Sequence, residues 1–124
     1  MPVNNNDLFH VLRIDKLDGM IVAKLGIDRD SEILKGHFPG HPVVPGACML
    51  QVVKDVLEDS LGTTLRLKKA DHLKFMSLVD PTERETVQLE IVYRDAGQEE
   101  TFVTAKVSAD ENICFKLQCT FVKI

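Results

Sequence analysis

The sequence predicts an α+β fold in which a curved antiparallel sheet wraps around one long central helix. Two observations lead to this fold class. Residues 46–60 have apolar side chains at helical spacing around most of the circumference, so this helix must be buried on most sides. Strand-like segments flank it, two before and four after, which gives the order β-β-loop-α-β-β-β-β. A sheet that curves around the helix is the simplest way to bury it.

Two strands joined by a tight turn are expected ahead of the helix. Residues 8–14 are β-like, Asp18-Gly19 provides a turn, and residues 20–27 form a second apolar run. From residue 28 to residue 45 the periodicity stops, and prolines and glycines become frequent. Because proline fixes φ, this stretch is predicted to be an ordered, irregular loop.

The helix is predicted from Gly46 to about Ser60, with Pro45 at its start and Leu61-Gly62 as a stop signal. Its apolar residues recur at helical spacing: Met49, Leu50, Val52, Val53, Val56 and Leu57. Its polar residues fall on a narrow stripe: Gln51, Lys54, Asp55, Glu58 and Asp59. We expect Asp55 and Glu58 to be solvated surface residues.

Four strands are predicted after the helix, over residues 65–75, 86–94, 101–108 and 113–122. Asp80-Pro81 separates the first two, and Asp95-Ala96-Gly97 is predicted to turn the chain between the second and third. One long apolar helix wrapped by such a sheet is how a hot-dog fold is built. We find no internal repeat or linker, so residues 1–124 are expected to form a single domain.

Composition excludes several classes of function. Nineteen acidic residues outnumber 15 lysines and arginines, and this balance argues against a nucleic-acid-binding protein. Three cysteines without a CxxC spacing, and no apolar segment typical of a secretion signal, indicate the cytoplasm. The apolar runs are far shorter than the roughly 20 residues that a membrane-spanning helix needs, so no membrane insertion is expected.

The candidate catalytic and metal-binding residues lie just before and inside the helix. His37 and His41 are four residues apart, but Pro39, Gly40 and Pro42 exclude the helix that would make them a metal site. Cys48 lies near the helix start, where the dipole favours a thiolate, but a small buried apolar role is the better interpretation. A histidine base beside the free N–H groups of a helix start remains, and a merely structural histidine is the alternative.

Residues 36–46 read GHFPGHPVVPG, which resembles the GHFPxxPVxPG signature of the bacterial 3-hydroxyacyl-acyl-carrier-protein dehydratases. Residues 70–75, ADHLKF, followed by Asp80-Pro81, are similar to the third-strand segment of the same family. The resemblance covers most of the chain, and it implies the hot-dog fold.

The resemblance also implies the roles of individual residues. His37 would be the catalytic base, the N–H of Gly46 would bind the thioester carbonyl, and the carbonyl of Val43 would orient the imidazole. We expect the substrate to be bound by Gly46, Val43, Phe38 and Cys48. The family's second catalytic group is a Glu or Asp fourteen residues after the histidine, and here that position is Gln51. An amide can hydrogen-bond the leaving hydroxyl but cannot give it a proton.

The resemblance further implies a homodimer, or a larger homo-oligomer, in which the partner's helix completes each site. No metal or cofactor is expected. The predicted reaction is dehydration of 3-hydroxyacyl thioesters of acyl carrier protein or coenzyme A to 2-enoyl thioesters, in fatty-acid or related lipid synthesis. Two alternatives stay open: a hot-dog thioesterase, in which Gln51 orients water, and a non-catalytic subunit that binds acyl thioesters or assembles with an active homologue.

Overall fold

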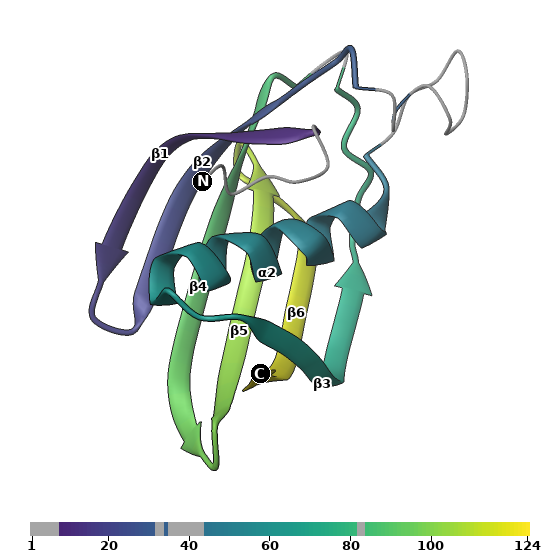
Figure 1. Cartoon of the computed structure of the whole chain (residues 1–124). Helices are drawn as coiled ribbons and strands as arrows, with labels where there is room; N and C mark the ends of the chain where they lie inside the picture. Colours follow the sequence, from purple (N-terminus) through teal and green to yellow (C-terminus); the bar gives the residue numbers. More distant parts are fainter. Residues whose placement is uncertain (1–7, 32–33, 35–43, 82–83) are drawn as a thin grey trace.

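A computed structural model describes residues 8–31, 34, 44–81 and 84–124, and all structural statements below concern these residues. One helix lies across one face of a six-stranded antiparallel sheet with strand order β1-β2-β4-β5-β6-β3 (Figure 1). The elements are β1 (Phe9–Leu17), β2 (Met20–Ile27), α2 (Gly46–Leu61), β3 (Leu65–Phe75), β4 (Thr86–Gly97), β5 (Glu100–Ala109) and β6 (Asn112–Lys123). This arrangement confirms the predicted α+β hot-dog fold.

The core lies between the helix and the sheet face that it covers. Because side chains alternate across a strand, every second residue of β6 points toward the helix. Four alternating residues of β6 are buried on this face: Phe115, Leu117, Cys119 and Phe121. From the helix, the apolar side chains of Met49, Val52, Val53, Val56 and Leu57 are buried against them. The sheet therefore buries one face of the helix, and the rest of its circumference is half-buried or exposed, so it is wrapped less completely than its apolar residues predicted.

The first hairpin matches the predicted turn. Gly19 has a φ of 72°, which glycine adopts without strain, and β1 and β2 pair from Leu17↔Met20 onward. Strand β1 ends at Leu17 instead of residue 14, because the pairing with β2 continues up to the turn.

The predicted turn at Asp95-Ala96-Gly97 is wrong. Strand β4 continues to Gly97, and the chain reverses at Gln98 and Glu99, which have φ values of 54° and 66°. The register shifts between Asp95 and Gly97, where the Gly97 N–H donates a hydrogen bond of 2.8 Å to Asp95 Oδ1. Asp95, Ala96 and Gly97 therefore form a β-bulge inside the strand, and the loop follows them.

Helix α2 ends as the sequence predicted. Gly62 follows the last turn with a φ of 66°, and its N–H donates a 2.8 Å hydrogen bond to the carbonyl of Glu58. A left-handed glycine that closes the last turn in this way is a common helix stop.

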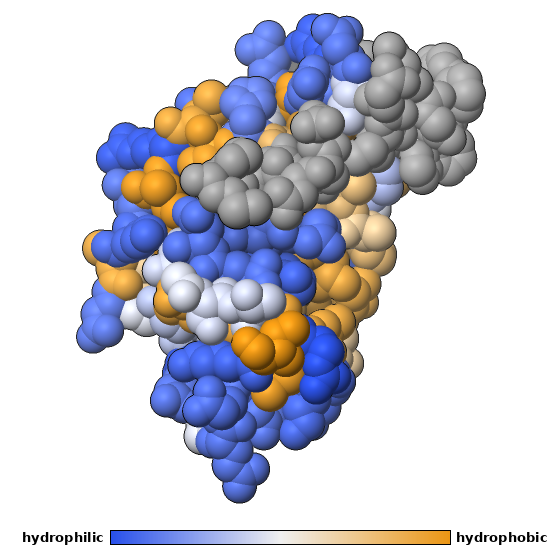
Figure 2. Space-filling model, in the orientation of Figure 1, coloured by the Kyte–Doolittle hydropathy of each residue, from blue (hydrophilic) through white to orange (hydrophobic). Residues whose placement is uncertain are grey.

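Strand β3 forms one edge of the described sheet, where it pairs with β6. Most of its residues are exposed, and large apolar side chains gather at its end and just beyond: Leu73, Phe75, Met76 and Leu78. Figure 2 shows an apolar area along this side of the molecule, whereas the outward face of the helix is hydrophilic. An apolar, one-sided edge strand is a surface on which another chain can pack.

Candidate functional site

The start of α2 offers backbone N–H groups for a ligand. Pro45 precedes the helix with φ −64° and ψ 141°, and among the described residues no side-chain hydrogen bond caps the helix start. The N–H of Cys48 already bonds the carbonyl of Pro45 at 3.0 Å, so the N–H of Gly46 lies ahead of the first internal bond. Such N–H groups, at the positive end of the helix dipole, favour an oxygen that carries negative charge.

Two contacts hold this helix start in place. The N–H of Val44 donates a 3.0 Å hydrogen bond to the carbonyl of Val79, which ties the chain before the helix to the segment after β3. On the other side, a Cβ added to Gly46 would overlap the ring of Phe75. The Phe75 ring in turn lies 5.2 Å, centroid to centroid, from that of Phe115, its partner across the sheet. A residue with a side chain at position 46 would therefore collide with the Phe75 ring unless the ring moved.

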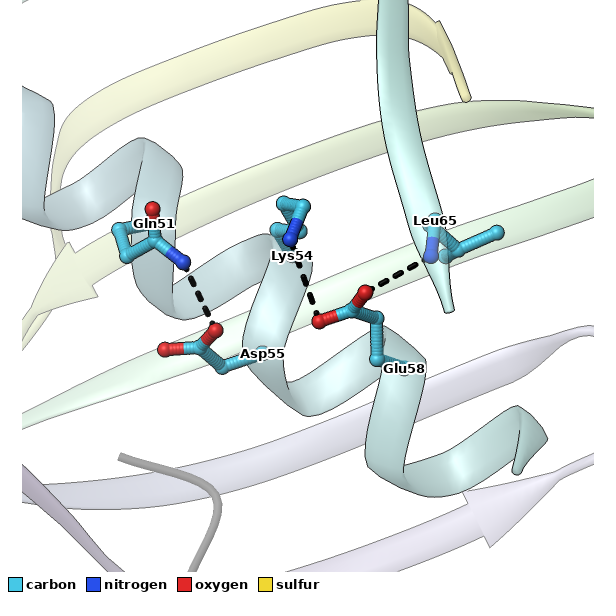
Figure 3. Close-up of polar contacts among 5 residues, drawn as sticks. All are labelled: Gln51, Lys54, Asp55, Glu58 and Leu65. Carbon is cyan, nitrogen blue, oxygen red and sulfur yellow. Dashed lines mark hydrogen bonds and ion pairs between the residues drawn. The ribbon is translucent and has the colours of Figure 1, made fainter. Parts of the chain in front are cut away.

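Gln51 lies in the first half of the helix and is exposed, although both of its C-terminal neighbours, Val52 and Val53, are buried. Its side chain is held on one side: Nε2 donates a 2.8 Å hydrogen bond to Oδ1 of Asp55, one turn later (Figure 3). The carboxylate accepts and the amide donates, so the remaining polar atom of Gln51, Oε1, is an acceptor.

The sequence suggested that Asp55 is a solvated surface residue, and this expectation is wrong. Only 5% of Asp55 is exposed, and the other buried residues of the helix are all apolar. The spacing of four residues between Gln51 and Asp55 was the signal that could have paired them, because such residues are neighbours on a helix.

Glu58 is also partly buried rather than solvated, and it has a structural role. One of its oxygens accepts a 2.7 Å hydrogen bond from the N–H of Leu65, the first residue of β3, and the other lies 3.3 Å from Nζ of Lys54 (Figure 3). The carboxylate thus joins the second half of α2 to the start of the edge strand.

Two of the cysteines, Cys48 and Cys119, have less thiolate character than an ordinary cysteine. Burial raises the pKa of the Cys48 thiol above its ordinary value. Burial, with a smaller contribution from the charge of Asp71, raises the pKa of Cys119 to about 12. Because the thiolate is the nucleophile, the half-buried Cys48 fits the apolar interpretation better than a nucleophilic one.

The structure brings three of the predicted site residues, Gly46, Cys48 and Gln51, onto the first half of α2. His37, Phe38 and Val43, together with His41, lie outside the described residues. Their predicted roles therefore stay predictions.

Other kinds of site find little support in the described part of the chain. No group of three or more His, Cys, Asp or Glu side chains is placed to hold a metal ion there. None of the helices described has the length and apolar character that crossing a membrane requires. A hollow of about 460 Å³ lies on the sheet face away from the helix, lined by residues such as Lys74, Lys106 and Lys116, and it contains none of the predicted site residues.

Two curated relatives of this chain are named as dehydratases. The 3-hydroxyacyl-[acyl-carrier-protein] dehydratase FabZ of Fusobacterium nucleatum is 25% identical over 117 residues, covering 90% of this chain and 82% of the relative. The FabZ of Pediococcus pentosaceus is 27% identical over 128 residues, covering 92% and 83%.

The fold is shared with the dehydratase heterocomplex ApeI:P from Xenorhabdus doucetiae, with a TM-score of 0.77, 18% identity, and coverage of 90% of this chain and 96% of that one. The ApeI-like family model, described as ApeI dehydratase, matches residues 13–116, which is most of the sequence. The chain therefore belongs to the ApeI-like family of dehydratases.

Proposed function

We propose that this protein dehydrates 3-hydroxyacyl thioesters, carried by acyl carrier protein or coenzyme A, to 2-enoyl thioesters. It would act in the cytoplasm, in fatty-acid or related lipid synthesis. Family membership supports the reaction class, and the names of the FabZ relatives support the 3-hydroxyacyl substrate. The observation that carries the proposal at the site is the exposed Gln51 amide, held by Asp55 on a helix that starts with an uncapped Gly46 N–H.

In this proposal Gly46 stabilises the charge that develops on the thioester oxygen. Removal of a proton from C2 places negative charge on the carbonyl oxygen, and a fixed N–H at a helix start stabilises that charge without reorganising. The Phe75 ring lies next to this glycine.

His37 would take the proton from C2, and the 3-hydroxyl would leave as water. An amide cannot donate the proton that the leaving oxygen requires, so the imidazolium of His37 would deliver the proton it has just taken. Oε1 of Gln51 would accept a hydrogen bond from the 3-hydroxyl and turn the oxygen lone pairs toward His37. One proton moves from carbon to oxygen, and the products are the enoyl thioester and water.

We further propose that the protein is a homodimer or a larger homo-oligomer, in which His37 of one subunit faces Gln51 of the other. Gln51 is exposed in the single chain, as a residue that contacts a partner's substrate must be. The apolar end of β3, with Phe75 54% exposed and Leu78 79% exposed, supplies surface for a second subunit.

Thioester hydrolysis is the second candidate, because an amide acceptor such as Oε1 of Gln51 can also orient a water molecule. The two reactions differ in their products. Dehydration removes water and leaves the thioester bond intact, whereas hydrolysis releases a free thiol.

The test is to incubate the protein with 3-hydroxyacyl thioesters of coenzyme A and of acyl carrier protein. Enoyl thioester is followed by mass spectrometry, and thiol release by a thiol reagent. The proposal predicts loss of water without thiol release, and loss of this activity in His37→Ala. Thiol release would favour the thioesterase. No product of either kind at high protein concentration would contradict both and favour the non-catalytic subunit.

A further inference from the structure

We infer that Asp55 is a positioning residue, which sets the orientation of the Gln51 amide so that the site selects ligands with a hydrogen-bond donor at C3. The inference rests on the proposed function, because it assigns Gln51 to the acyl thioester site. It goes beyond that function by adding a residue and a basis for substrate selection.

The Gln51 side chain is in direct contact with Asp55. Gln51 Nε2 and Asp55 Oδ1 are 2.8 Å apart, within the range of N–H···O hydrogen bonds. Figure 3 shows the amide nitrogen pointing to the carboxylate and the amide oxygen pointing away from it. Asp55 is buried, and a hydrogen bond in partly buried surroundings is electrostatically stronger than the same bond in water.

The Asp55 carboxylate and the Gln51 amide differ in the hydrogen-bonding groups that they offer. A carboxylate has acceptors only, whereas the amide of Gln51 has a donor end and an acceptor end. If the amide turned over, Oε1 would face the carboxylate and two acceptors would meet. The carboxylate therefore holds the donor end through one of its two N–H groups, and Oε1, which points away from Asp55, is the atom that we assign to the ligand.

The orientation of the Gln51 amide determines which group at C3 of the ligand fits the site. An acceptor at this place favours a substrate that offers a donor, such as a 3-hydroxyl. It disfavours a 3-keto group, which has acceptors only, and gives no bond to a chain without oxygen at C3. A site built for a hydroxyl discriminates strongly against analogues without one, since its polar atom is then left unpaired. The substrate class that fits is the 3-hydroxyacyl thioester rather than its 3-keto or saturated counterparts.

The test measures binding, so that it does not depend on turnover. In the full-length His37→Ala protein, dissociation constants are compared for 3-hydroxyacyl-, 3-ketoacyl- and saturated acyl-coenzyme A of one chain length. With Asp55 intact, the hydroxyl ligand is expected to bind roughly tenfold tighter than the keto ligand, the scale of one charge-supported hydrogen bond. Asp55→Asn, whose amide can donate or accept, is expected to reduce this ratio to within about twofold by weakening the hydroxyl ligand selectively.

Two further variants separate orientation from structure. Asp55→Glu keeps a carboxylate within reach of the amide and is expected to retain the preference for the hydroxyl. Asp59→Asn makes the same change of charge at an exposed position one turn further along the helix and is expected to leave the ratio unchanged. If Asp55→Asn does not fold, the side-chain amide resonance of Gln51 is measured by NMR in the Asp55→Glu protein instead. The inference requires that this resonance keeps the signature of a hydrogen-bonded N–H.

Equal binding of the hydroxyl and keto ligands with Asp55 intact would overturn the inference. So would an Asp55→Asn variant that weakens both ligands by the same factor, since that is the result of a purely structural role. Absence of enoyl product from the unmodified protein would contradict the proposed function alone, because the binding ratios can still be measured.

Discussion

The ring of Phe75, at the end of the edge strand β3, lies against the α-carbon of Gly46, where helix α2 begins. The two residues are far apart in sequence, and their contact joins the exposed edge of the sheet to the helix start that would bind the thioester oxygen. Phe75 is also in contact with the buried Phe115, which ties it to the core.

Gly46→Ala is expected to destabilise the fold, because its Cβ would overlap the Phe75 ring. The ring is half exposed and can turn aside, so we expect a loss of about 1 kcal/mol in the free energy of unfolding, the low end for overpacking. Urea unfolding at a fixed protein concentration measures it. In a Phe75→Ala background the same substitution should cost little, and an equal cost in both backgrounds would refute the contact.

Gln51→Glu is expected to increase dehydration roughly 10²-fold, because it restores a group that can donate a proton. The introduced carboxyl would lie beside Asp55, and a neighbouring carboxylate raises the pKa of a carboxyl group. A general acid acts only while protonated, so the gain should be present below the raised pKa and disappear as the pH rises through it.

The rate of Gln51→Glu measured against pH tests this coupling. Adding Asp55→Asn removes the neighbouring charge, so the loss of activity should shift to lower pH. Identical pH profiles with and without Asp55→Asn would show that the two positions do not interact.

Glu58→Ala is expected to destabilise the protein by about 1–3 kcal/mol, because the N–H of Leu65 would lose its acceptor. Glu58→Gln keeps an oxygen at that place and should cost less. Asp59→Ala, at an exposed neighbouring position, is the matched control. Chemical denaturation measures all three, and equal effects of Glu58→Ala and Asp59→Ala would contradict the structural role of Glu58.

Cys48 is expected to react slowly with iodoacetamide at neutral pH. Burial raises the pKa of its thiol, so the thiolate fraction is lower than that of an ordinary cysteine and increases only at higher pH. The rate of alkylation between neutral and alkaline pH, read at this residue by mass spectrometry, tests the direction of the shift. Fast alkylation at neutral pH would indicate an activated thiol instead.

Much of the fold could be predicted because local patterns and tertiary structure agree. The many apolar residues of α2 required a sheet to pack against. The end of the helix was predictable because Gly62, which follows it, tolerates a positive φ. The Asp95-Ala96-Gly97 pattern failed because the same residue types serve bulges as well as turns, and only pairing with β5 decides between them.

The candidate site could be predicted only in part. The motif identified Gly46 and the register to Gln51, but the interpretation of Asp55 depended on burial, which helical spacing alone does not give. The closeness of Phe75 to Gly46 is a contact between distant segments, and no local pattern specifies such a contact.

Subunit complementation tests whether this protein is a dehydratase whose sites are shared between subunits, because activity in the mixture requires both. His37→Ala and Gln51→Ala proteins are each assayed for enoyl thioester, and then after unfolding and refolding together in equal amounts. Half of the dimers should be mixed, each with one intact site, so the mixture should reach up to about a quarter of the unmodified rate. A mixture no more active than the average of the two variants would contradict a dehydratase site shared between subunits.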